Sequence, residues 1–404
     1  MSSVANRRIL VAILALSLLV GGLFLWRSTS PPLPFKVRVI KVTDGLGLHG
    51  QIVVLTDGNI MAADYRTIFT IGPSGNESSR FDAGPADNHV HIDPNLAMTT
   101  DGTLVFSRRR GAVVALRDGK ISWEFADPGS FAKEPLPLPD GGLCVIASNR
   151  LVRLAPGGSV LWTYTAAATL YQAPWLAPDG GLHFAEAMRS NSFMVKLNAD
   201  GSLRWRHPSD PGRGPAFAQN GTIYWGRETN ITLAAFKPDG TPLWQLNRPE
   251  QALSLPVVGR DGTIFLTANV LYKHVLLAVS PDGRLKWEFN LESSATLDAP
   301  AIGSDGTLYL VTRDRWVRAI SPDGQLKWHY RVKPRPAISR NLTWKALLSD
   351  LRTDFGESRT DLHGPPVPGP DGKLYVNFGH TGSIYIFEPQ SVGPAAASSK
   401  FESR

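Results

Sequence analysis

The sequence has almost no cysteine, since Cys144 is the only one in 404 residues. A single thiol excludes an intrachain disulfide and any CxxC metal or redox site. Cys144 lies in the apolar run "GGLCVIA", which predicts a buried structural thiol. The chain also lacks the GxSxG, P-loop, GxGxxG and HExxH motifs. The common catalytic and nucleotide-binding signatures are therefore missing, although an enzyme site assembled from scattered loops stays open.

Dense basic tracts are missing too. The net charge is +7, and no single stretch of Lys and Arg is concentrated enough to indicate a nucleic-acid partner. A solvated, slightly basic surface is the favoured interpretation. Attraction to an anionic surface such as phospholipid headgroups is the alternative.

One stretch near the N-terminus is long, apolar and uncharged. Residues 9–26, "ILVAILALSLLVGGLFLW", are just long enough to span a bilayer as a helix. Arg7 and Arg8 precede the span, which places residues 1–8 in the cytoplasm and the remainder across the inner membrane, in the periplasm or extracytoplasmic space. A cleaved signal peptide is the alternative interpretation of this stretch. The absence of an A-x-A-like site favours an uncleaved single-pass anchor, followed by a stiff linker at 27–34.

Two short signatures alternate along the rest of the chain. An Asp-Gly or Asn-Gly step before an apolar run occurs eight times between Asp57 and Asp371, as in "DGTLYL" at Asp305. Such steps predict hairpin turns in which both central residues take positive φ. The period is near 41 residues and contains four short strands, which is the pattern of a β-propeller blade. The sequence therefore predicts an all-β, eight-bladed propeller over residues 35–390.

The second signature, x-DG-x-hydrophobic-Trp, places a tryptophan at one fixed position in six of the repeats, as in "SPDGRLKW" and "SPDGQLKW". A large flat side chain at that position is expected to fill the gap between neighbouring blades, because each blade packs face to face on the next. These structural tryptophans are Trp123, Trp162, Trp205, Trp244, Trp287 and Trp328.

The last repeat lacks its tryptophan-bearing strand. The segment "PFKVRVIKV", residues 34–42, alternates like a strand and precedes the first repeat. We expect it to supply the missing outer strand, which closes the ring and leaves no open edge. Residues 391–404 are polar and small, and we expect them to form a disordered tail.

The repeats resemble the PQQ-like (quinoprotein-type) β-propeller family, most clearly in "DGTLYLVTRDRWVR" followed by "AISPDGQLKWHY". The resemblance implies an eight-bladed propeller and includes both pyrroloquinoline-quinone (PQQ) dehydrogenases and BamB-type non-catalytic periplasmic propellers. Many of those dehydrogenases carry an adjacent cysteine pair, which this chain cannot provide. No segment matches their calcium and catalytic aspartate motifs, and no lipoprotein cysteine of the BamB branch is present.

These departures favour a membrane-anchored binding or assembly scaffold for envelope proteins, with no cofactor, no metal and no catalytic residue expected. A PQQ- and calcium-dependent oxidoreductase, or another propeller enzyme, is the first alternative. A carbohydrate or small-ligand sensor is the second.

Loops that join one blade to the next are expected to crowd one mouth of the central channel, where ligand-binding residues would lie. Trp175 begins an inner strand and either faces the channel as a stacking platform or packs in the core. His89, His91 and Asp93 are either metal-ligating or simply solvated. The channel-mouth candidates are His89, His91, Asp93, Trp175, Arg213, Asp298 and His363.

The last repeat interval is about 25 residues longer than the others, which marks an insertion at about 331–360. Within it, five apolar residues fall on one face of a predicted helix. This amphipathic helix either docks on a partner or a membrane surface, or packs onto its own propeller. The five residues are Trp344, Leu347, Leu348, Leu351 and Phe355.

Overall fold

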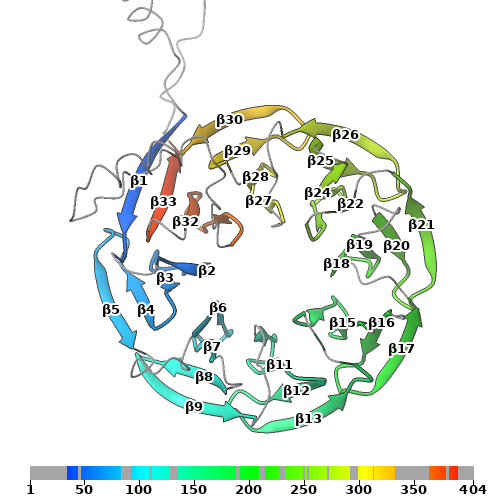
Figure 1. The fold of residues 1–404 in the computed structure, drawn as a ribbon, viewed down its shortest axis with the longest axis horizontal. Helices are drawn as coiled ribbons and strands as arrows, with labels where there is room; N and C mark the ends of the chain where they lie inside the picture. The colour runs from blue at the N-terminus through cyan, green and yellow to red at the C-terminus, as the bar shows by residue number, and fades with distance from the viewer. Residues whose placement is uncertain are drawn as a thin grey trace, which may run out of the picture. The chain divides into compact units, whose positions relative to one another are not determined.

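The computed structural model divides the chain into two units, one of Met1–Lys36 with Pro389–Arg404 and the other of Val37–Glu388. Nearly all residues that it describes belong to the second unit, which forms a ring of eight β-sheets (Figure 1). The described residues are 34–43, 47–82, 92–108, 112–127, 135–168, 170, 172–187, 192–208, 214–226, 233–248, 251–252, 254–270, 273–291, 299–312, 314–332, 364–378 and 382–389.

The first four blades each contain four consecutive antiparallel strands, numbered from the channel outward. Blade 1 consists of β2 (His49–Val54), β3 (Ile60–Ala63), β4 (Thr67–Ile71) and β5 (Glu77–Asp82). Blade 2 consists of β6 (Ile92–Met98), β7 (Leu104–Arg108), β8 (Ala112–Arg117) and β9 (Lys120–Ala126). Blade 3 consists of β10 (Leu136–Pro137), β11 (Leu143–Ala147), β12 (Arg150–Leu154) and β13 (Val160–Thr165). Blade 4 consists of β14 (Trp175–Leu176), β15 (Leu182–Ala187), β16 (Ser192–Leu197) and β17 (Leu203–Pro208).

The next three blades repeat this order, with a divided inner strand in blade 6. Blade 5 consists of β18 (Gly214–Phe217), β19 (Ile223–Gly226), β20 (Leu233–Phe236) and β21 (Pro242–Leu246). Blade 6 consists of β22 (Gln251–Ala252), β23 (Val257–Val258), β24 (Ile264–Val270), β25 (Lys273–Val279) and β26 (Leu285–Asn290). Blade 7 consists of β27 (Ala301–Ile302), β28 (Leu308–Val311), β29 (Trp316–Ile320) and β30 (Leu326–Arg331).

Blade 8 combines the two ends of the ring, as the sequence predicts. It consists of β31 (Val367–Pro368), β32 (Leu374–Phe378), β33 (Ser383–Pro389) and, outermost, β1 (Phe35–Lys41). Within the second unit, Arg38 pairs with Glu388 at 3.2 Å, and the Val42 N–H donates to the Gly382 carbonyl at 2.9 Å. The prediction that the N-terminal strand closes the ring is confirmed.

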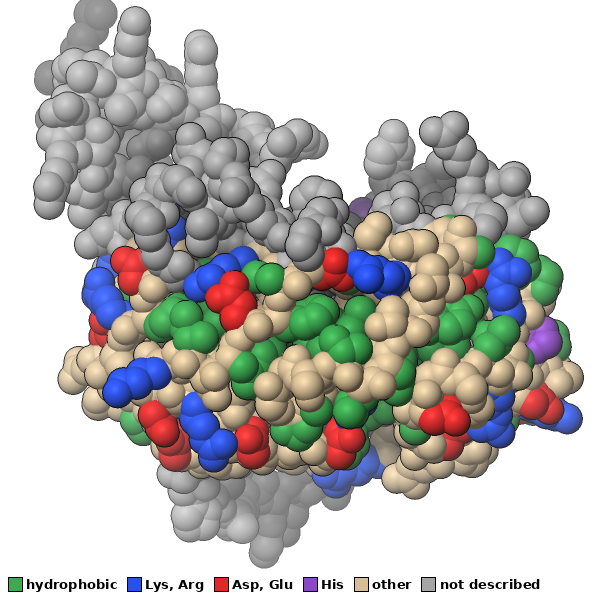
Figure 2. Space-filling model, turned by 90° about the horizontal axis from the view of Figure 1, so that it is seen from below, with side chains coloured by type: hydrophobic (Ala, Val, Ile, Leu, Met, Phe, Trp, Pro, Cys, Tyr) green, Lys and Arg blue, Asp and Glu red, His purple; other side chains and the backbone are tan. Residues whose placement is uncertain are grey.

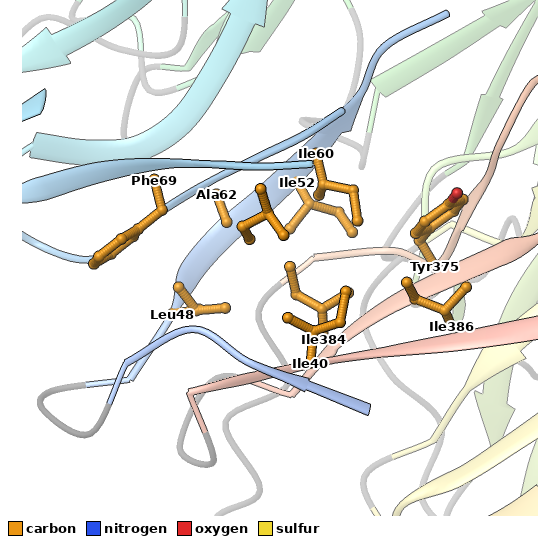
Figure 3. Close-up of a cluster of buried hydrophobic side chains, with 10 residues drawn as sticks. Ile40, Leu48, Ile52, Ile60, Ala62, Phe69, Tyr375, Ile384 and Ile386 are labelled. Carbon is orange, nitrogen blue, oxygen red and sulfur yellow. The ribbon is translucent and has the colours of Figure 1, made fainter. Parts of the chain in front are cut away.

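A continuous apolar cluster seals the join between blades 8 and 1. Ile40 of the closing strand lies among side chains from both blades (Figure 3). The cluster includes Ile52 and Ile60 from blade 1 and Ile384 and Ile386 from blade 8. Chain closure therefore buries apolar surface as well as pairing backbone groups.

The turns differ in one respect from the prediction. In every described Asp-Gly or Asn-Gly step the glycine has a positive φ, but the preceding residue does so only at Asp118. In most of the other turns the Asp or Asn side chain accepts the backbone N–H two residues on, as Asp305 does from Thr307 at 3.0 Å. In the turns of Asp282 and Asp323 a serine hydroxyl accepts this N–H instead. Either bond holds the residue before the glycine in an ordinary turn conformation, so only glycine has to enter the left-handed region. The expectation of positive φ at both central residues is wrong for these turns.

Five of the six repeat tryptophans contact the second turn of the following blade. The indole N–H donates to a backbone carbonyl of that turn, and the glycine of the same turn packs against the indole ring. These hydrogen bonds are Trp123 to Pro156 (2.8 Å), Trp162 to Ala199 (3.2 Å), Trp205 to Pro238 (3.1 Å), Trp244 to Pro281 (2.8 Å) and Trp287 to Pro322 (3.0 Å).

Trp328 is the exception, because blade 8 is closed by the chain's two ends and has no such turn. It stacks on Phe387 instead, with ring centroids 5.6 Å apart. In six blades, a tryptophan on the outer strand therefore contacts the next blade, through a turn in five of them and through Phe387 in the sixth.

No helix long and apolar enough to cross a membrane occurs among the described ranges given above. The anchor predicted at 9–26 lies outside them, as do residues 333–360 of the predicted insertion. Arg331 ends β30 and Val332 is buried, so the first two residues of the predicted insertion belong to blade 7.

Candidate functional site

Most of the channel-mouth residues predicted from the sequence lie outside the described part of the chain. These are His89, His91, Arg213, Asp298 and His363. Asp93 belongs to β6, but its side chain is not among those described. The predicted docking residues Trp344, Leu347, Leu348, Leu351 and Phe355 also lie outside. Their roles stay predictions.

Trp175 is described, and it lies between blades 4 and 5. Its ring meets that of the fully buried Trp225 edge to face, with centroids 5.9 Å apart. Gly214 packs directly beneath the same indole, where a Cβ atom would overlap it. Trp175 is thus part of the packing between these two blades.

The structure does reveal a place where the repeat is broken. In each blade, one row of side chains across the four strands faces the next blade. In blades 5, 6 and 7 this row contains an aromatic residue on the second strand, alanine on the third and tryptophan on the fourth. These sets are Tyr224–Ala235–Trp244, Phe265–Ala278–Trp287 and Tyr309–Ala319–Trp328.

Alanine leaves room for the two rings to meet, with centroids about 6 Å apart in each case. The distances are 5.9 Å between Tyr224 and Trp244, 5.8 Å between Phe265 and Trp287, and 6.0 Å between Tyr309 and Trp328. Such pairs add stability beyond the area they bury. The row is thus an aromatic seam between blades.

Blades 3 and 4 replace the alanine of this row by a buried cation. The rows read Cys144–Arg153–Trp162 in blade 3 and His183–Lys196–Trp205 in blade 4. Arg153 is 5% exposed and Lys196 is 1% exposed. Long cationic side chains are almost never buried to this degree without a partner.

The partner is the aspartate of the first turn in the same blade. Arg153 donates to Asp140, and Lys196 Nζ lies 2.5 Å from Asp179 Oδ2. Burial tends to raise the pKa of Asp179, but the bonds from Lys196 and from the Gly181 N–H outweigh it and hold that pKa below its ordinary value. Both cations are therefore neutralised within their own blades.

A second glycine makes space for each cation. A Cβ atom on Gly181 would lie 2.8 Å from Lys196 Cε, and one on Gly142 would overlap the Arg153 guanidinium. Blades 6 and 7 have threonine at this position, and its hydroxyl donates to the turn aspartate, as Thr263 does to Asp261 at 2.6 Å. The sequence therefore pairs "DGT" with alanine, and "DGG" with a buried cation.

His183 is paired with Lys196 in blade 4 and is also fully buried. Neither ring nitrogen has a hydrogen-bond partner among the described residues. Trp205 and Phe217 face its ring, with centroids 5.3 and 5.0 Å away. Burial, reinforced by the charge of Lys196, lowers the pKa of His183 from 6.5 to about 3, so the imidazole is neutral at pH 7.

On its other face, blade 4 buries a carboxylate against blade 3. Glu186 is fully buried, and its Oε2 accepts a bond from Arg206 Nε at 2.8 Å. The Ala167 N–H, in the segment that joins blades 3 and 4, points to Oε1 at 3.4 Å. The Arg206 guanidinium in turn covers the Phe193 ring at 3.3 Å from its centroid. Blade 4 thus carries buried charge on both faces.

This arrangement does not supply an evident reaction centre. Among the described residues, no group of three or more His, Cys, Asp or Glu side chains is placed to hold a metal ion. Cys144 is fully buried, and burial raises the pKa of its thiol far above the ordinary value, which keeps it protonated. The prediction of a buried structural thiol agrees with this environment.

The surface offers a second candidate, which we call the outer belt. It consists of large aliphatic side chains on the outermost strands, with exposed fractions of 37–58%. Figure 2 shows hydrophobic side chains gathered in a band along one side of the ring, with charged side chains above and below. The members are Val39, Ile121, Val160, Leu161, Leu203, Leu243, Leu285 and Leu326.

A β-bulge just before the repeat tryptophan explains two of these positions, Leu161 and Leu243. In blade 3, Arg153 pairs with Trp162 while Leu154 pairs with Val160, so Leu161 is the extra residue. The bulge turns this side chain out of the ladder. Blades 6 and 7 have Lys286 and Lys327 at this position, where they reach the turn aspartate. Leucine at 161 leaves an apolar side chain in solvent.

The fold is a β-propeller of the PQQ-like class. Its marks are the four-stranded blades, the contacts between tryptophans and turns of neighbouring blades, and the closure of blade 8 by the N-terminal strand. The sequence profile of the family described as outer membrane protein assembly factor BamB matches residues 25–185 and 190–355, which is most of the chain. The chain belongs to this family. No curated protein sequence matches it.

Several solved structures share the fold. BamB from Moraxella catarrhalis superposes with a TM-score of 0.63 at 16% identity, over 88% of this chain and 99% of that one. Sqt1 from Saccharomyces cerevisiae gives a TM-score of 0.63 at 12% identity, over 86% and 98% of the two chains. A catalytically inactive virginiamycin B lyase from Staphylococcus aureus gives 0.53 at 13% identity, over 88% and 99%. Because one of these is a lyase, the fold alone does not separate a scaffold from an enzyme.

Proposed function

We propose that the protein is a membrane-anchored, periplasm-facing propeller that acts as a binding or assembly scaffold for envelope proteins. Family membership carries this proposal, since the family is described as an outer membrane assembly factor. The uncharged stretch at 9–26 supplies the anchor, and the positive charges before it orient the propeller away from the cytoplasm.

The outer belt supports protein binding in physical terms. Exposed apolar side chains bordered by charge are typical of protein interfaces, in which an apolar centre is surrounded by a polar rim. Leu161 and Leu203 lie on neighbouring blades and are 58% and 50% exposed. A rigid ring can present such side chains without reorganising, which lowers the entropy lost on binding.

Cell fractionation of the full chain tests the anchor and the scaffold together. We expect the chain to sediment with the inner membrane at its uncleaved mass, and to co-purify with an envelope protein after detergent extraction. A chain with residues 9–26 replaced by a cleavable signal peptide should appear in the soluble periplasm. A mature chain that begins after residue 26, or a cytoplasmic location, would contradict the anchor.

The oxidoreductase alternative makes a distinct prediction in the same preparation. A bound cofactor stabilises the folded state by mass action, so saturating PQQ with calcium would raise the melting temperature. We expect no such rise. A clear rise, together with oxidation of a small alcohol or sugar and no co-purifying protein, would replace the scaffold with an enzyme.

A further inference from the structure

A cavity of about 220 Å³ opens between blades 3 and 4, on the side of the ring where the Asp-Gly turns lie. Blade 3 contributes its first turn and the buried Arg153, and blade 4 contributes its first hairpin and the start of its second turn. The lining residues are Leu138, Pro139, Asp140, Arg153, Leu176, Gly180, Leu182 and Ala199. Its wall is thus mostly aliphatic, with one ion pair.

The cavity occurs where blade 4 departs from the repeat. Blades 5, 6 and 7 have a proline in the second turn, and its ring fills the space beside the first-turn glycine. A Cβ atom on Gly262 would lie 3.1 Å from Pro281, and one on Gly306 would lie 3.0 Å from Pro322. In blade 4 the residue is Ala199, and a Cβ atom on Gly180 would meet no described atom within 4 Å. The missing proline ring leaves this volume open.

Arg153 gives the cavity a polar end. Its Nη1 donates to the carbonyls of Leu143 and Leu154, and its Nη2 donates to Asp140. A guanidinium has five N–H groups, so two of them, Nε–H and one on Nη2, have no partner among the described residues. These donors suit an oxygen acceptor, and a carboxylate suits them best because its geometry matches the guanidinium fork.

The charges around the cavity are close to balanced. Arg153 pairs with Asp140, while Lys196 and Arg204 both pair with Asp179, at 2.5 and 3.2 Å. A third carboxylate, Asp200, follows the lining residue Ala199. Recognition of an anion therefore rests on the two remaining N–H donors of Arg153 and not on an excess of positive charge.

We propose that this cavity binds a small monocarboxylate with an apolar body, its carboxylate on Arg153 and its body against Leu138, Leu176 and Leu182. The volume suits this class, because a cavity of about 150 Å³ accommodates benzene. The site lies in a single inter-blade gap and is independent of a protein partner on the outer belt.

Calorimetric titration of the full chain in nanodiscs with sodium benzoate tests the proposal, with empty nanodiscs as the blank. We expect saturable binding with a dissociation constant of about 1 mM or below, and binding at least about 10-fold weaker for neutral benzyl alcohol. Absence of saturable benzoate binding would overturn the proposal. Equal affinity for the two compounds would overturn carboxylate recognition by Arg153.

Two variants locate the binding. Ala199→Pro inserts the residue that blades 5, 6 and 7 carry at this turn, so the fold should tolerate it, and it should abolish benzoate binding. Arg153→Met keeps an apolar stem and should weaken benzoate at least about 10-fold while sparing benzyl alcohol. The control Pro281→Ala removes the ring between blades 5 and 6, where Ala235 stands at the position of the arginine, and should leave benzoate binding unchanged. Benzoate bound equally by Ala199→Pro and Arg153→Met would place the ligand elsewhere.

Discussion

Replacing Gly158 by alanine is expected to destabilise the propeller by about 2–5 kcal/mol. Two effects combine in this estimate. Gly158 has a φ of +82°, where an L-residue costs about 1–2 kcal/mol. The new Cβ would also lie 2.7 Å from two ring atoms of Trp123 in the preceding blade, and overpacking of this kind costs about 1–3 kcal/mol. Urea denaturation monitored by tryptophan fluorescence measures the sum.

Gly102→Ala is the matched control for this substitution. Gly102 has the same φ of +82°, but its Cβ would meet no described atom within 4 Å. We expect this substitution to lower the free energy of unfolding by about 1–2 kcal/mol, which is the cost of the left-handed backbone conformation alone. Equal losses in the two variants would mean that the contact between tryptophan and turn glycine does not hold neighbouring blades together.

His183→Phe is expected to stabilise the protein and to remove part of its sensitivity to acid. Phenylalanine is the residue that blade 6 has at this position, Phe265, where it packs on Trp287 as His183 packs on Trp205. Removing two buried nitrogens without partners should add about 1–3 kcal/mol at pH 7. Thermal unfolding at a series of pH values gives both effects.

The direction of the pH effect follows from the lowered pKa. The unfolded chain protonates His183 near pH 6.5, whereas the folded chain resists protonation down to about pH 3. The unfolded state therefore binds more protons in this window, and the stability contributed by the neutral imidazole is lost as pH falls from 6.5 towards 3. Between pH 6.5 and 4.5 the loss is about 2–3 kcal/mol at most, at 1.36 kcal/mol per unit.

The charged neighbours of His183 also affect the stability of the folded state, and their contribution must be separated from that of His183. Lys196, Asp179 and Arg204 act on its pKa through their charges. The difference between parent and variant removes contributions that both share. The reciprocal variant Phe265→His should introduce a similar acid sensitivity in blade 6. Parallel pH profiles for parent and His183→Phe would contradict the assigned protonation state.

The fold could be predicted because each repeat requires particular residue types at fixed positions. Turns need glycine at a positive φ, and each blade needs a large ring at a fixed place, so both recur at a period near 41. Closure was also predictable, because a blade that lacked one strand pointed to a spare strand at the N-terminus. The turn conformation was not, because the aspartate side chain satisfies the backbone in a way that the dipeptide alone does not reveal.

The break at blades 3 and 4 was missed for a different reason. The eight turns look alike in the sequence, although "DGG" at Asp140 and Asp179 differs from "DGT" at Asp101, Asp261 and Asp305. The difference gains meaning only when the register places Arg153 and Lys196 opposite the tryptophans, where other blades have alanine. A bulge shifts that register by one residue, so sequence spacing did not bring these positions together.

The scaffold is the central claim, and site-specific photo-crosslinking in intact cells tests it most directly. A photoreactive phenylalanine analogue placed at Leu161 or Leu203 lies on the outer belt, where these side chains are 58% and 50% exposed. The same analogue at Arg80, whose side chain is 63% exposed on β5 of blade 1, a strand without a belt member, is the control.

The account predicts one discrete crosslinked envelope protein from both belt positions and none from the control. The crosslink should weaken when the other belt leucine is replaced by aspartate, because an apolar contact is lost. No protein adduct from either belt position, or the same adducts from Arg80, would contradict a protein-binding belt and the scaffold function with it.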